Sequence, residues 1–177
     1  MGGSGRFSIP SYYTALTRLW FSPGRFFGEI PESQSFVQSF GFLFLSSLFF
    51  AAASLLYIHE QVLFKAVILL FNALAMPFLG AAFAYLVMTM MMGKRSGYLR
   101  LFTVYAFASG ATMLLAWIPF SLWFTETWKW VIIGIGLVKA CRFRPLQAAA
   151  VIGFSVIILI LFFWSLGPLI LLLKRTG

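Results

Sequence analysis

The sequence predicts an all-α, polytopic membrane protein: a bundle of five transmembrane helices preceded by an N-terminal interfacial amphipathic helix. Of its 177 residues, 62% are hydrophobic and only 10% are charged. A soluble domain usually carries about 25% charged residues, so this chain has too few polar side chains to cover a core in water. Its apolar residues also form long runs separated by short basic clusters, which is typical of helices that cross a bilayer.

The first 34 residues precede the first long apolar run. Residues 1–10 are expected to be flexible, and residues 11–34 to form amphipathic helices in the membrane interface. Ser22 followed by Pro23 is a common helix start. Packing of this stretch over the end of the bundle is a compatible alternative. The apolar stripe at helical spacing consists of Tyr12, Leu16, Leu19 and Trp20.

Five apolar stretches are expected to cross the membrane. The second is longer than a bilayer requires, and Pro77 within it removes one backbone hydrogen bond, so we expect it to tilt or kink. The fourth has a continuous apolar core only from Trp130 to Val138, and a segment this short could re-enter the membrane instead of crossing it. The expected spans are residues 36–58, 64–91, 99–120, 125–141 and 146–173.

Basic residues discriminate between these topologies, because Lys and Arg gather on the cytoplasmic side. If the fourth stretch crosses, nine cations lie inside and four outside; if it turns back, the split is eight to five. Crossing is therefore favoured, with a cytoplasmic N-terminus and the C-terminus outside. Eight of the inner cations are candidates to bind lipid headgroups: Arg18, Arg25, Lys94, Arg95, Arg100, Lys139, Arg142 and Arg144.

Small and polar side chains within the second and third spans are candidates for helix contacts or a groove. Ala106 and Gly110 are four residues apart, so they share a helix face that another helix can approach closely. Asn72 is costly in lipid unless its amide bonds to a neighbouring helix or a freed carbonyl; a substrate or ion site is the alternative. The full set is Asn72, Pro77, Tyr105, Ala106, Ser109, Gly110 and Thr112.

The composition argues against an enzyme. The chain has one histidine, one cysteine and no aspartate, so we predict no catalytic residue, no metal site and no cofactor. His59 and Glu60 lack the second histidine of a zinc-protease motif. The basic clusters lie between apolar runs instead of along one face, so nucleic acid is not an expected partner.

Three segments occur in an order found in a known family. Pro23, Phe26 and Phe27 precede the first span, YLRLFTVYAFASGATMLLAWIP forms the third, and WVIIGIGL precedes a basic loop. Over about residues 15–170 the chain resembles the Yip1 domain family, its bacterial members most of all. It departs from the family at Ser109-Gly110, where the third helix often has a proline.

The resemblance implies a five-span bundle in a bacterial cytoplasmic (inner) membrane with the N-terminus in the cytoplasm. Eukaryotic relatives bind prenylated small GTPases and have a long cytosolic N-terminal region; this sequence has about 30 residues there, so that activity is not carried over. We expect a non-catalytic scaffold or subunit that binds lipids and either other membrane proteins or itself. The alternative is lipid handling or small-molecule transport through a groove around Asn72, Tyr105, Ser109 and Thr112.

Overall fold

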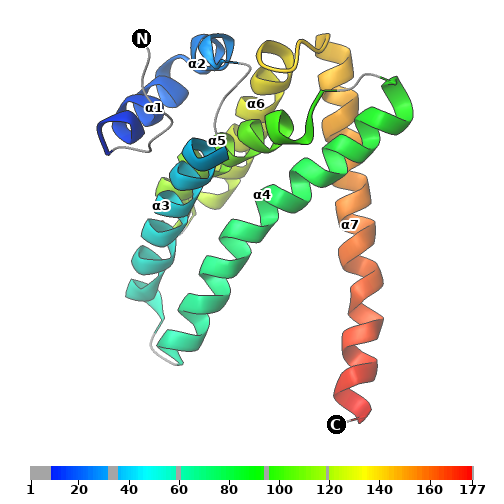
Figure 1. Cartoon of the computed structure of the whole chain (residues 1–177). Coiled ribbons are helices and arrows are strands. Elements are labelled where there is room, and N and C mark those ends of the chain that lie inside the picture. Colours follow the sequence, from blue (N-terminus) through cyan, green and yellow to red (C-terminus); the bar gives the residue numbers. More distant parts are fainter. Residues whose placement is uncertain (1–8, 32–35, 59–60, 94–95, 119, 177) are drawn as a thin grey trace.

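The computed structural model describes residues 9–31, 36–58, 61–93, 96–118 and 120–176, and every element among them is helical (Figure 1). A short 3-10 helix, Leu55–Tyr57, extends the third α-helix. The α-helices are α1 (Ile9–Phe21), α2 (Pro23–Glu29), α3 (Phe36–Ser54), α4 (Val62–Met92), α5 (Tyr98–Ala116), α6 (Leu122–Lys139) and α7 (Pro145–Thr176).

Helix α5 is the centre of the bundle. Every residue from Leu101 to Thr112 is buried, and α5 packs against α1, α3, α4 and α6. This helix has no single apolar face, because its side chains are covered on all sides by other helices. This packing agrees with the close helix contact that the sequence predicts for the third span.

Side-chain contacts show how α3 and α4 run relative to α5. Helices α3 and α5 are parallel, since Ser39 bonds to Thr103 at 3.1 Å while, about one turn further along both helices, Phe42 and Phe107 have ring centroids 5.0 Å apart. Helices α4 and α5 are antiparallel: Phe78 stacks on Phe102 near the middle of α4, whereas Tyr85 meets Tyr98 at the start of α5.

Helices α6 and α7 continue this alternation. The Arg100 Nε near the start of α5 donates to the carbonyl of Ala140 at 2.6 Å, while Val104 lies against Gly136, so α5 and α6 are antiparallel. Only residues 140–144 connect α6 to α7, and Gly134 of α6 lies against Ile152 of α7, so this pair is antiparallel as well. Consecutive helices from α3 to α7 therefore run in alternating directions, and α6 returns the chain to the end where α4 finishes (Figure 1).

Four helices are long and apolar enough to cross a membrane: Phe36–Tyr57, Val62–Met91, Tyr98–Ala116 and Pro145–Trp164. The predicted fold class, a helical polytopic membrane protein, is confirmed. Helix α6 is not among the four, because its 18 residues include Glu126, Lys129 and Lys139. Glu126 and Lys129 form an ion pair at 2.6 Å. The alternating helix directions favour five membrane crossings, and that number remains a prediction.

Some helix ends differ from those expected. Helix α5 stops at Ala116 instead of continuing to residue 120, because residues before a proline are disfavoured in helical conformation and Pro119, itself outside the described residues, follows. The Ser121 hydroxyl bonds to the carbonyls of Leu115 and Ile118 at 2.6 and 2.8 Å. Helix α1 begins at Ile9, inside the stretch expected to be flexible; residues 1–8 lie outside the described part. Helix α4 continues unbroken through Pro77.

The two N-terminal helices pack on the bundle. In α1, Tyr12 shares a 3.0 Å hydrogen bond with Ser46 of α3, and the Trp20 indole donates to the carbonyl of Ala111 in α5 at 3.3 Å. In α2, Phe27 is fully buried beside Gly136. The opposite side of α1 exposes apolar side chains, Phe21 most of all at 85%, which fits the predicted interfacial position.

Candidate functional site

The small residues of α5 make contacts inside the bundle. Ala106 has no exposed surface, and Gly110 lies so close to α3 that a Cβ atom there would be 2.8 Å from the Phe42 ring. The close approach predicted for this face occurs between α5 and α3 of the same chain. Neither residue is therefore available to another protein while the bundle is folded.

The polar residues predicted to line a groove lie in different surroundings. Tyr105 is buried with its ring against Gly80 of α4. The Thr112 hydroxyl bonds back to the carbonyls of Ala108 and Ser109, at 3.2 and 3.1 Å, so its polarity is satisfied within its own helix. Ser109 is buried, whereas the fourth candidate, Asn72, is exposed on α4.

Asn72 presents an amide on the outer surface of an apolar helix. It follows the start of α4 at Val62 by about 15 Å of helix, which is near the middle of a hydrocarbon core about 30 Å thick. Within the described part of the chain the amide forms no hydrogen bond. The amide does not donate even to the carbonyl of Ala73. That carbonyl lacks its usual helical donor because Pro77, which is buried, has no N–H.

Several predicted headgroup cations lie near the end of the fold where α6 meets α7. The Arg100 side chain is held there by the carbonyl of Ala140, and Lys139 lies beside Gly24 of α2. Lys94 and Arg95 lie outside the described residues. The exposed members of the set are Arg18, Arg25, Lys139, Arg142 and Arg144.

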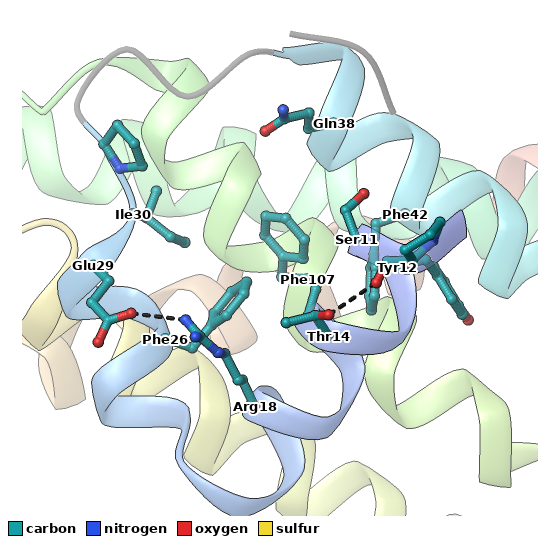
Figure 2. A pocket seen from close by; sticks show the side chains of 13 residues that line it. Ser11, Tyr12, Thr14, Arg18, Phe26, Glu29, Ile30, Gln38, Phe42 and Phe107 are labelled. Atoms are coloured by element: carbon teal, nitrogen blue, oxygen red, sulfur yellow. Dashed lines mark hydrogen bonds and ion pairs between the residues drawn. The ribbon is translucent and has the colours of Figure 1, made fainter. Parts of the chain in front are cut away.

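A cavity of about 450 Å³ lies between the two N-terminal helices and the bundle. Figure 2 shows Arg18 of α1 and Glu29 of α2 facing each other, with a 2.8 Å ion pair between them, and Phe26 and Phe107 beside them. The cavity is lined by Pro10, Ser11, Tyr12, Thr14, Ala15, Arg18, Phe26, Glu29, Ile30, Pro31, Gln38, Phe42 and Phe107.

An aromatic cluster forms the inner wall of this cavity. The Phe107 ring lies 5.0 Å from both Phe26 and Phe42, and Phe42 lies 4.8 Å from Tyr12. Burial raises the pKa of the Tyr12 phenol, an effect that its hydrogen bond to Ser46 partly opposes. The phenol is therefore a neutral hydrogen-bonding group at physiological pH.

The chemistry of the cavity lining suits binding more than catalysis. Its ionisable groups are Arg18, Glu29 and the neutral Tyr12, so the described lining holds no pair of carboxylates and no nucleophile with a neighbouring base. Within the described residues, no three His, Cys, Asp or Glu side chains come together to hold a metal ion.

Among the residues that line the cavity, the sequence indicated only Arg18 as a candidate binding residue. Glu29, Gln38, Phe42 and Phe107 belong to segments separated by up to 78 positions in the chain, as their numbers show, and no local pattern joins them. The one available signal was the apolar stripe through Tyr12. It predicts that α1 packs against another element but does not identify that element.

Comparison with known proteins identifies one family. The family model for the Yip1 domain matches residues 17–167, which is most of the chain and includes all seven helices at least in part. No curated protein matches the chain, and neither does any solved structure.

Proposed function

The chain belongs to the Yip1 domain family, and we propose that this integral membrane protein is a non-catalytic scaffold whose copies associate side by side in the bilayer. The observation that carries the proposal is the exposed Asn72 amide on α4. Association through α4 would leave the packing of the central helix α5 untouched.

The first half of α4 has few neighbours within its own chain. Leu63, Phe64 and Phe71 are exposed by 81, 64 and 73%, respectively. Apolar exposure of this kind suits lipid as well as protein, so it does not by itself indicate an interface. It does leave a whole face of α4 free to meet another helix.

Asn72 distinguishes this face from an ordinary lipid-facing one. An amide in hydrocarbon has no water to bond, and leaving its donors and acceptor unpaired is costly. Pairing with a second helix removes that cost, and such interhelical bonds contribute about 0.6 to 2 kcal/mol. The residue therefore favours association of α4 with another membrane helix.

A second copy of the chain is the simplest partner for Asn72. A carboxamide has both N–H donors and a carbonyl acceptor, so two Asn72 side chains related by a two-fold axis can each donate to the other. Symmetric dimers of this isologous kind are the commonest homo-oligomers. Ile68, one turn before Asn72, is half exposed on the same side of α4 and would pack against its symmetry mate.

We also propose that the end of the fold that carries Arg100, Lys139, Arg142 and Arg144 faces the cytoplasm of a bacterial cell. The support is the excess of basic residues in the segments predicted to share this side. In that orientation α1 and α2 lie at the inner leaflet.

Replacing Asn72 with leucine is expected to weaken self-association about tenfold, the effect of losing roughly 1.4 kcal/mol of interhelical hydrogen bonding. The measurement is Förster transfer between donor-labelled and acceptor-labelled copies in liposomes over a range of protein-to-lipid ratios. Asn72→Gln keeps the amide and is expected to retain most of the transfer.

The matched control is Thr89→Val on the same helix. Its exposed hydroxyl is already bonded to the carbonyl of Tyr85 at 2.7 Å, so its removal is expected to change the transfer by less than about twofold. Self-association of the Asn72→Leu variant at wild-type strength would overturn the proposal.

A further inference from the structure

The cavity between the N-terminal helices and the bundle changes in character with depth. Gln38 lies two residues after the start of α3 at Phe36, and Phe42 lies about 6 Å further along the helix. Arg18 and Glu29 are both more than half exposed, whereas Phe42 and Phe107 are buried. The cavity therefore has a polar, accessible rim and an aromatic inner wall.

Its position along α3 matches the boundary between headgroups and hydrocarbon. Helix α3 is one of the four helices long and apolar enough to cross, and that stretch begins at Phe36. Of the lining residues, Gln38 thus lies where this helix would enter the bilayer, and Phe42 lies within the first turns of the span. An amphipathic ligand fits such a site better than a wholly polar one.

The charges at the rim are balanced. Arg18 and Glu29 are the one cation and the one anion among the 13 lining residues, so the described lining offers no net attraction to an anion. A guanidinium has five N–H donors and a carboxylate accepts several hydrogen bonds. The single bond between Arg18 Nη1 and Glu29 Oε2 therefore leaves most of the bonding capacity of both groups unused.

We propose that this cavity binds the phosphoethanolamine headgroup of a membrane phospholipid. The phosphate would bond to the Arg18 guanidinium and the primary ammonium to the Glu29 carboxylate, and the two-carbon link between them lets both reach a pair of charges 2.8 Å apart. The glycerol and the first carbons of the acyl chains would lie against Phe26, Phe42 and Phe107.

Other lipid classes fit less well. A phosphatidylglycerol headgroup has no cation for Glu29 and would be repelled by it. A free phosphorylated amine would pair with the same two charges, but it would leave the aromatic wall without an apolar partner. The site is separate from the exposed face of α4, and binding there does not depend on self-association.

The test is binding of single phospholipids to the purified full chain in detergent, measured by native mass spectrometry. Phosphatidylethanolamine is expected to bind about tenfold more tightly than phosphatidylglycerol, because phosphatidylglycerol cannot form the charge-assisted bond to Glu29 and is repelled by that carboxylate. Arg18→Gln and Glu29→Gln are each expected to weaken phosphatidylethanolamine binding by about the same factor. The pair is solvent-exposed and contributes little to stability, so both variants are expected to fold.

Two matched controls separate the site from general effects. Arg25→Gln removes an exposed cation of α2 that does not line the cavity, and it is expected to leave binding unchanged. Thr14→Trp fills part of the cavity and leaves both charged side chains in the sequence, whereas Thr17→Trp places the same ring on α1 outside the lining residues. Of these two tryptophan variants, only Thr14→Trp is expected to weaken phosphatidylethanolamine binding.

Three results would overturn the proposal. Phosphatidylglycerol binding as tight as phosphatidylethanolamine binding would indicate a non-selective surface. Equal losses of phosphatidylethanolamine binding in Arg18→Gln and Arg25→Gln would indicate that binding depends on surface charge alone. Displacement of the lipid by an equal concentration of soluble glycerophosphoethanolamine would show that the ligand is a free zwitterion and not a phospholipid.

Discussion

Replacing Gly136 with alanine is expected to destabilise the folded protein by about 2 kcal/mol or more, because overpacking costs outweigh the gain in helix propensity. A Cβ atom there would lie 2.5 Å from Val104 Cγ1 and 3.2 to 3.3 Å from the ring of Phe27. Both neighbours are buried, Val104 at the centre of α5 and Phe27 in α2. The added methyl group would therefore push α6 away from two helices at once.

The control for this variant lies two residues earlier on the same helix. A Cβ atom at Gly134 would meet only Ile152 at 3.6 Å, an ordinary contact, so Gly134→Ala is expected to be neutral or to stabilise by up to about 1 kcal/mol. Thermal unfolding in detergent, followed by circular dichroism, compares the two. Val104→Ala in the Gly136→Ala background is expected to recover part of the loss, and wild-type stability of Gly136→Ala alone would contradict the packing described.

Replacing Gly110 with leucine is expected to cost more than about 3 kcal/mol, or to prevent folding, because a branched side chain would enter a space without room for one carbon. The Cβ atom alone would be 2.8 Å from the Phe42 ring and 3.2 Å from Ser46 Oγ. Separation of α3 from α5 would also disturb α1, which bonds to α3 through Tyr12 and to α5 through Trp20.

This variant distinguishes an internal contact from a contact with a partner. Gly153→Leu is the control, because a Cβ atom at Gly153 meets nothing within 4 Å and the variant is expected to fold normally. The measurement is the fraction of Gly110→Leu protein that elutes as a folded species in detergent. If Gly110→Leu folds like the wild type and loses only self-association, α5 and not α4 carries the interface.

The fold could be predicted from the sequence because its signals are local. Apolar run lengths, Pro119 at the end of the third run and the basic clusters indicate the helices and their order. Helix α6 shows where this reasoning is weakest, since its 18 residues combine an apolar core with the ion pair between Glu126 and Lys129. Its direction became evident only from long-range contacts such as the bond between Arg100 and Ala140.

The candidate sites could be predicted only in part. Asn72 is recognisable in the sequence because an amide in a long apolar run needs a partner. The spacing of Ala106 and Gly110 correctly predicts a close helix contact, but spacing does not say whether the second helix belongs to the same chain. The cavity was not predictable, since it forms only when α1 and α2 fold back over α3 and α5.

Disulfide cross-linking in liposomes, with Cys141→Ser as the cysteine-free background, tests association through α4 most directly. Ile68→Cys places a thiol on the exposed side of α4 one turn from Asn72, and Ile157→Cys places one on α7 with a similar exposed fraction, 50 against 53%. We predict cross-linked dimers from Ile68→Cys, far fewer when Asn72→Leu is added, and few from Ile157→Cys. Dimers from Ile157→Cys with none from Ile68→Cys would contradict association through α4.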